Sequence, residues 1–238
     1  CDLGCKYCFY TDEMSCRSEA VRGMMKTETV SRILGKALER CAEHMPPEPL
    51  SVGFQGGEPL LAGIDFYRFV CDFVEKNNTR GVRVSYFLQT NGTHLDAEFA
   101  EFFAAHGFLV GLSVDGPKEY HDRHRVTRDG RSCFNRVMRA AENMRRAGVE
   151  FNTLTVVTSA SATHAQALYG FFARSGFRYQ QYIPCVAPFG AVDNAKLGLD
   201  ADKYGEFLCR MFDLWYADAC RGESSYVYNR DFENWVGI

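Results

Sequence analysis

Short strand-like segments alternate with helical segments along this chain, and this alternation constrains the fold more than any other feature. Segments rich in β-branched and aromatic residues, typical of strands, cover residues 50–55, 82–89, 109–114, 151–157 and 178–186. Between them, apolar residues recur at helical spacing after Thr27, after Asp96 and after Ser132. Strand-then-helix units joined by short loops predict an α/β fold with a parallel sheet, either doubly wound or part of a barrel.

Polar and glycine-rich motifs follow the predicted strands. They are QGGEP at 55–59, QTNG at 89–92, SVDGP at 113–117 and PCV at 184–186. A glycine or proline after one strand is more often turn chemistry than ligand chemistry. Several such motifs at the carboxyl ends of parallel strands, the edge where these folds gather binding groups, favour a ligand site.

The first eight residues, CDLGCKYC, place Cys1, Cys5 and Cys8 at a CxxxCxxC spacing. Closed structural zinc sites and electron-transfer iron–sulfur sites usually take four protein ligands. A compact triplet therefore favours a [4Fe–4S] cluster with one iron left open to another ligand. A partial zinc site that stabilises a non-enzymatic module and an iron–sulfur electron carrier remain as alternatives.

Composition limits the choice of partner and compartment. The 238 residues include 46% hydrophobic and 24% charged residues, and no apolar run approaches the ~20 residues of a membrane span. A net charge of −3 argues against a nucleic-acid partner. Ten cysteines in a long, aromatic-rich chain, three of them in a metal-type cluster, favour a reducing cytoplasm over a disulfide-bonded secreted domain.

The chain resembles the radical S-adenosylmethionine (SAM) superfamily and, within it, the anaerobic sulfatase-maturating enzymes of the SPASM group. The segments that carry this resemblance are CDLGCKYCFY, FQGGEPLLAG, QTNG, GLSVDGP with EYHDRHR, YIPCV and FDLWYAD. The resemblance implies a partial (β/α)6 barrel of the TIM-like type whose first strand precedes Cys1. It also implies an oxidoreductase that converts a cysteine or serine of a sulfatase to formylglycine through a 5′-deoxyadenosyl radical.

The resemblance assigns roles residue by residue. Cys1, Cys5 and Cys8 match the ligands of the [4Fe–4S] cluster, and Tyr10 and Gln55 match contacts to the substrate peptide. The positions that match SAM contacts are Tyr7 and Val186 beside the adenine, Gly57 at the amino group, Ser113 at the ribose and Arg125 at the carboxylate. A glycine at position 57 lets the backbone approach a ligand closely, and a planar guanidinium suits a carboxylate.

The implied partners are a sulfatase polypeptide or another peptide substrate, and an electron donor such as ferredoxin or flavodoxin. The runner-up within enzymes is another SPASM peptide modifier that forms thioether or carbon–carbon crosslinks. Such an enzyme would share the barrel motifs described above.

The C-terminal part departs from the family pattern. We expect residues 1–190 to form the radical SAM barrel and residues 191–238 to be a helical linker toward a SPASM region outside this chain. The chain is then a fragment, and the aspartate expected to act as catalytic base lies beyond it, so no catalytic residue is assigned. Cys209 and Cys220 would lie ~16 Å apart on one helix, too far to share a cluster, and are expected to be packed thiols.

Overall fold

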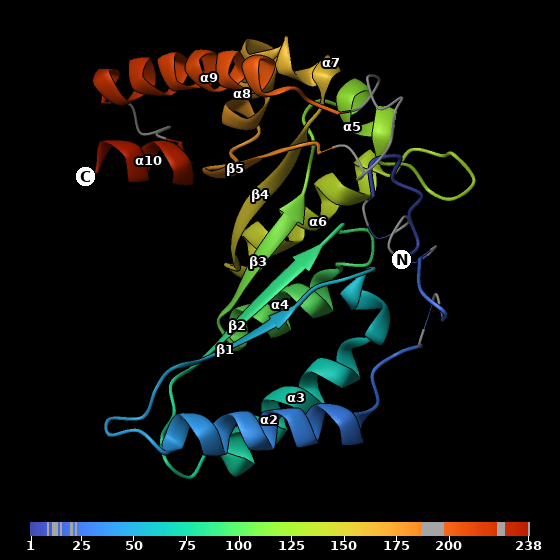
Figure 1. Cartoon of the computed structure of the whole chain (residues 1–238), viewed down its shortest axis with the longest axis vertical. Helices are drawn as coiled ribbons and strands as arrows, with labels where there is room; N and C mark the ends of the chain where they lie inside the picture. The colour runs from blue at the N-terminus through green and yellow to red at the C-terminus, as the bar shows by residue number, and fades with distance from the viewer. Residues whose placement is uncertain are drawn as a thin grey trace.

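A parallel sheet organises the computed structural model, which describes residues 1–8, 10, 14, 16–19, 21, 23–186, 198–222 and 227–237 (Figure 1). Within these ranges the sheet has six strands, and their order across it follows their order in the chain. The strands are β1 Leu50–Phe54, β2 Val84–Thr90, β3 Phe108–Ser113, β4 Glu150–Val157, β5 Tyr179–Pro184 and β6 Tyr228–Asn229. Every neighbouring pair is parallel, and β1 and β6 are the two edges. The sheet is thus not closed, which confirms the predicted partial barrel.

Helices connect the strands and cover the outer side of the curved sheet (Figure 1). They are α2 Thr27–Ala42, the 3-10 helix η1 Pro59–Ala62, α3 Ile64–Asn77, α4 Ala97–Ala105, α5 Lys118–His124, α6 Phe134–Ala147, α7 Ser159–Ala162, α8 Ala165–Arg174, α9 Ala201–Arg221 and α10 Arg230–Val236. The helices predicted after Thr27, Asp96 and Ser132 are α2, α4 and α6. Asp96 caps α4 by accepting a hydrogen bond from the Phe99 amide at 3.0 Å.

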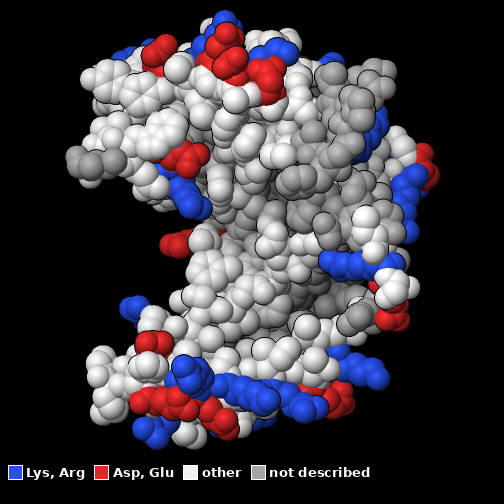
Figure 2. All heavy atoms as spheres, viewed as in Figure 1, with Lys and Arg blue, Asp and Glu red and all other residues white. Residues whose placement is uncertain are grey.

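The two faces of the sheet differ in burial. In β3, Phe108, Val110 and Leu112 are fully buried in the main core, whereas Leu109 between them is 38% exposed. This alternation follows from the two-residue period of a strand. Figure 2 shows that the hollowed face is mainly uncharged, with charged side chains gathered over α2 and α9 at its two ends. The inner face of the sheet is therefore the open one.

The strand register brings the predicted motifs to one edge of the sheet. Thr90 at the end of β2 pairs with Leu112, and Ser113 at the end of β3 pairs with Leu154. Val157 at the end of β4 pairs with Pro184. Because the strands are parallel, the turns that follow them lie together, and the N-terminal segment runs along the same side (Figure 1).

The described part of residues 191–238 holds more than the predicted helix. β6 pairs with β5, and the buried Phe232 of α10 joins the main core. The predicted boundary at residue 190 lies outside the described residues. The expectation that Cys209 and Cys220 are packed is wrong, because both are exposed. α9 buries a different stripe, formed by Phe207, Met211 and Trp215. Among the described residues, no helix is long and apolar enough to cross a membrane.

Candidate functional site

Backbone hydrogen bonds fix the cysteine loop to the end of α5 and to the segment that follows it. The Gly4 amide donates to the Val126 carbonyl at 2.9 Å, and the Lys6 amide donates to the His124 carbonyl at 3.1 Å. Leu3 forms an isolated antiparallel bridge with Thr127. The loop that carries the three predicted metal ligands is thus paired with a second loop rather than free in solvent.

Asp2 ties the same loop to the end of β2. Its carboxylate accepts hydrogen bonds from Asn91 Nδ2 at 2.9 Å and from Thr93 Oγ1 at 2.8 Å. Burial opposes ionisation of Asp2, but these hydrogen bonds outweigh it and hold the pKa of the carboxyl below its usual value. The QTNG motif therefore anchors the cysteine loop.

The three cysteines of the loop are free thiols. Cys1 is exposed, and Cys5 and Cys8 are half-buried. Burial raises the pKa of Cys5 to about 11, although the nearby Arg125 charge works in the opposite direction. A thiol binds a metal as the thiolate, so metal binding at Cys5 would release a proton.

The spacing of the loop thiols bears on the choice between a cluster and a single ion. Among the described residues, the trio His121, Asp122 and Cys133 is the one set of metal-type ligand atoms that all lie within 4.8 Å of one another. The three loop thiols are therefore not all this close to one another. A zinc ion needs ligands converging at ~2.0–2.3 Å, whereas each thiolate of an iron–sulfur cluster binds its own iron. The arrangement of the thiols is thus compatible with a cluster.

One cavity of about 390 Å³ lies at the carboxyl edge of the sheet, and every residue with a predicted role lines it. These are Cys1, Cys5, Tyr7, Cys8, Tyr10, Gln55, Gly57, Ser113, Arg125 and Val186. They come from the cysteine loop, the ends of β1 and β3, and the segments after α5 and β5. The size is typical of a small-molecule site.

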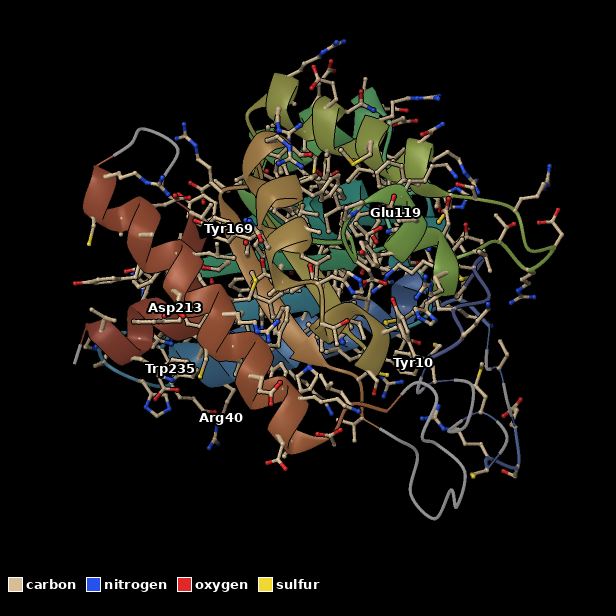
Figure 3. The ribbon with its side chains drawn as sticks, turned by 90° about the horizontal axis from the view of Figure 1, so that it is seen from above. Tyr10, Arg40, Glu119, Tyr169, Asp213 and Trp235 are labelled. Carbon is tan, nitrogen blue, oxygen red and sulfur yellow. The ribbon has the colours of Figure 1, made fainter. Side chains whose placement is uncertain are left out.

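The rim of this cavity is formed by residues of different exposure. Val186 is 80% exposed, at the end of the described segment that follows β5. Tyr10 lies on the side of the molecule where the N-terminal segment runs, well separated in this view from Asp213 on α9 (Figure 3). Asp213 is not among the residues that line the cavity.

Gly56 and Gly57 turn the chain beside the cysteine loop. Their φ angles are +98° and +58°, a region that residues with side chains rarely adopt. A Cβ at Gly57 would lie 3.4 Å from the Cys1 nitrogen, and a Cβ at Gly56 would lie 3.5 Å from the Tyr10 hydroxyl. Glycine at these positions thus serves the turn, while a Cβ at either position would make an ordinary van der Waals contact with the N-terminal segment.

Glu58 joins the QGGEP turn to the end of β2. One carboxylate oxygen accepts from the Thr90 hydroxyl at 2.7 Å and from the Leu60 amide at 3.1 Å, and the other accepts from the Asn91 amide at 2.8 Å. Glu58 is 4% exposed, and this burial raises the pKa of its carboxyl despite the hydrogen bonds. Its role is to hold two strand-end motifs together.

Asp115 and Arg125 form a buried ion pair at the wall of the cavity. Arg125 Nε donates to Asp115 Oδ2 at 3.0 Å, with side chains that are 10% and 4% exposed. Burial opposes the charge of Arg125, but the combined effect of Asp115, Tyr7 and Cys5 outweighs it and raises the pKa of the guanidinium. The Nη nitrogens make no hydrogen bond among the described residues, and Arg125 lines the cavity. They are available to a ligand in the cavity.

Asp115 also organises the surroundings of this pair. Its other oxygen accepts from the Val156 amide at 3.1 Å, and Oδ2 accepts a second hydrogen bond from the Tyr7 hydroxyl. The Arg125 guanidinium lies 5.4 Å from the centre of the Tyr7 ring. Asp115 was not among the predicted site residues. The sequence feature that indicates a site role for Asp115 is its position in the SVDGP motif, as an acidic residue directly after a buried strand.

Comparison with known proteins identifies the family to which the sequence is similar. The model of the radical SAM superfamily matches residues 1–164. A cysteine-type anaerobic sulfatase-maturating enzyme of Clostridium novyi is 38% identical over an alignment that covers 100% of this chain and 62% of that protein. A serine-type enzyme of Bacteroides thetaiotaomicron is 29% identical, covering 100% of this chain and 60% of that protein.

Solved structures share the fold. Native anSMEcpe with bound AdoMet and Cp18Cys peptide superposes with a TM-score of 0.88 at 36% identity, covering 98% of this chain and 61% of that one. Streptococcus suis SuiB bound to precursor peptide SuiA has a TM-score of 0.66 at 18% identity, covering 97% of this chain and 46% of that one, a likeness of fold alone. The chain spans about three fifths of the length of the curated relatives it matches.

Proposed function

We propose, from the premise that this chain belongs to the radical SAM superfamily, that it forms the cofactor-binding part of an enzyme that oxidises a sulfatase side chain to formylglycine. The observation that carries the proposal is that all residues with a predicted role line one cavity at the carboxyl edge of the sheet. A zinc-stabilised module or a simple electron carrier has no use for such a cavity.

The residues present fit a [4Fe–4S] cluster and SAM. Cys1, Cys5 and Cys8 would hold the cluster, and the Nη nitrogens of Arg125, which make no hydrogen bond within the described part of the chain, suit the SAM carboxylate. For the rest of SAM we propose the backbone of Gly57 at the amino group, Ser113 at the ribose, and Tyr7 and Val186 beside the adenine. When bound, the cluster and SAM supply one-electron cleavage of SAM to a radical that removes a hydrogen atom from the substrate.

The protein's own contribution is positioning. The QTNG and QGGEP turns hold the cysteine loop, and Asp115 fixes Arg125. Tyr10 and Gln55, which line the same cavity, are proposed to contact the target peptide.

The substrate is proposed to be a peptide of a sulfatase that presents a cysteine or serine. The higher identity to the cysteine-type relatives favours cysteine. An electron donor such as ferredoxin or flavodoxin would reduce the cluster, and the oxygen sensitivity of such a cluster suits a reducing cytoplasm. The division into a barrel part, 1–190, and a helical part, 191–238, stays a prediction, as does a catalytic aspartate outside this chain.

The test uses the complete protein that carries this chain, reconstituted anaerobically with iron and sulfide. It is incubated with SAM, dithionite and a peptide containing a Cys-x-Pro-x-Arg motif, and the peptide is analysed by mass spectrometry. Formylglycine at the cysteine is the expected product. Parallel peptides carry serine or alanine at that position and establish the target specificity.

Two variants control this assay. Cys5→Ala should abolish cluster and product, whereas Cys71→Ala, which removes a buried thiol of α3 outside the cavity, should preserve both. Cleavage of SAM with modification of a non-sulfatase peptide alone would favour a crosslinking enzyme of the same group. Zinc without sulfide in the active preparation would overturn the proposal.

A further inference from the structure

His121 and Cys133 are buried polar residues that lie outside the cavity and have no role in the function proposed above. They are 0% and 1% exposed, respectively. His121 belongs to α5, and Cys133 immediately precedes α6. His121 contacts Asp115, and Cys133 contacts Arg125.

Hydrogen bonds connect these four residues in a closed ring. The Asp115 amide donates to His121 Nδ1 at 3.4 Å, and His121 Nε2 lies 3.4 Å from Cys133 Sγ. Cys133 Sγ donates to the Arg125 carbonyl at 3.3 Å. The ring closes where Arg125 Nε donates to Asp115 Oδ2 at 3.0 Å.

The direction of these hydrogen bonds is consistent around the ring. A backbone amide can only donate, so His121 Nδ1 must accept, and a neutral imidazole then carries its proton on Nε2. Burial lowers the pKa of His121 to about 4, which keeps its imidazole neutral near pH 7. Each of the four residues thus donates to the next, so the donors and acceptors around the ring are matched.

Arg125 is held by this ring at its backbone as well as at its side chain. Its amide donates to the His121 carbonyl at 2.8 Å, and its own carbonyl accepts from the Cys133 thiol. The residue ends α5 in an extended conformation rather than a helical one. When the Cys133 thiol is removed, the Arg125 carbonyl loses the hydrogen bond from that side chain. The backbone of Arg125, and with it the position of the guanidinium, is then less constrained.

We propose that His121 and Cys133 are positioning residues that hold Arg125 and Asp115 in the geometry that binds the carboxylate of SAM. The inference rests on the proposed SAM-binding function. It gives the two residues a role through Arg125, and neither of them touches the ligand.

The test measures SAM affinity by equilibrium dialysis on unreduced, anaerobically reconstituted complete protein, with iron and sulfide content determined for each variant. Cys133→Ala should raise the dissociation constant for SAM about tenfold, the effect of one lost hydrogen bond at the upper end of its usual range. Cys133→Ser, which keeps a donor, should stay within about threefold of wild type. The buried-thiol control Cys71→Ala should bind SAM as wild type does.

A double-mutant cycle separates positioning from general loss of packing. In an Arg125→Ala background, Cys133→Ala should weaken SAM binding no further, because the residue through which Cys133 acts is gone. Equal SAM affinity in wild type and Cys133→Ala, or an additive loss in the double variant, would overturn the inference. Absence of SAM binding to the wild type would instead refute the proposed function.

Hydrogen–deuterium exchange tests the ring without SAM, including for a variant that folds poorly. Peptides covering residues 113–125 should exchange faster in Cys133→Ala and in His121→Phe than in wild type, and Cys71→Ala should match wild type. Unchanged exchange in this segment in both ring variants would show that the ring does not hold Asp115 and Arg125. Tight zinc binding that depends on His121 and Cys133 would overturn the ring in favour of a metal site.

Discussion

Breaking the ion pair between Arg125 and Asp115 should destabilise the fold as well as the ligand site. The pair is 3.0 Å apart, with side chains 10% and 4% exposed. The Coulomb attraction at this distance is about 5.5 kcal/mol at the effective dielectric constant of ~20 that suits protein interiors. Removing both ions from water costs a similar amount, so the net contribution of the intact pair is small.

Removal of one partner has a larger effect, because the other charge stays buried without compensation. Arg125→Met should lower the free energy of unfolding by about 3–5 kcal/mol. The double variant Asp115→Asn/Arg125→Met should recover most of this loss, since the asparagine side chain keeps an acceptor for the Val156 amide and carries no charge. The coupling energy between the two positions should be about 3 kcal/mol.

Urea unfolding under anaerobic, reducing conditions measures these free energies. Arg68→Met is the control, because Arg68 contacts Asp65 and Glu98 on an exposed surface and such pairs contribute about 0–1 kcal/mol. If Arg125→Met destabilised the protein equally in the wild-type and Asp115→Asn backgrounds, the two residues would not be coupled. The account of Arg125 as a charge held by Asp115 would then be wrong.

Other predictions concern the turns and buried groups around the cavity. Gly57→Val should reduce both iron content and SAM binding, because the φ of +58° is strained for valine and its Cβ approaches the Cys1 nitrogen; normal iron content would contradict this. Glu58→Gln should cost about 2 kcal/mol in urea unfolding, since one carboxylate oxygen that accepts from an amide becomes a donor. The pKa of His121 is lowered to about 4 in the folded protein. As the pH falls from ~6.5 to ~4, the His121 imidazole therefore takes up a proton in the unfolded state but not in the folded state. The free energy of unfolding should fall by about 3 kcal/mol over this range. The difference in unfolding free energy between wild type and His121→Phe should shrink over that range, and a constant difference would refute the assignment.

Local patterns account for the parts of the fold that the sequence predicted. The β-branched runs match β1 to β5 within a few residues, and Asp96 and Gly148 mark helix ends because a cap and a left-handed turn depend on near neighbours. β6 has two residues and no periodicity, so only its pairing with β5 reveals it.

The predicted site residues came from motifs, whereas the residues that support them depend on contacts distant in sequence. Glu58 reaches Asn91, and Asp115 joins Tyr7 and Arg125 across the sheet edge. Cys133 gives no signal in the sequence, because a lone thiol before a helix is usually a packing residue. The sequence therefore predicts which residues line the cavity better than it predicts what holds them.

Electron paramagnetic resonance tests whether the three thiols hold a [4Fe–4S] cluster whose open iron meets SAM in this cavity. The complete protein is reconstituted anaerobically, reduced with dithionite and measured with and without SAM. We expect a reduced-cluster signal that changes when SAM is added, is absent in Cys5→Ala and is retained in Cys71→Ala. A signal that SAM leaves unchanged, or one that persists in Cys5→Ala, would refute the assignment of the cluster and its open iron.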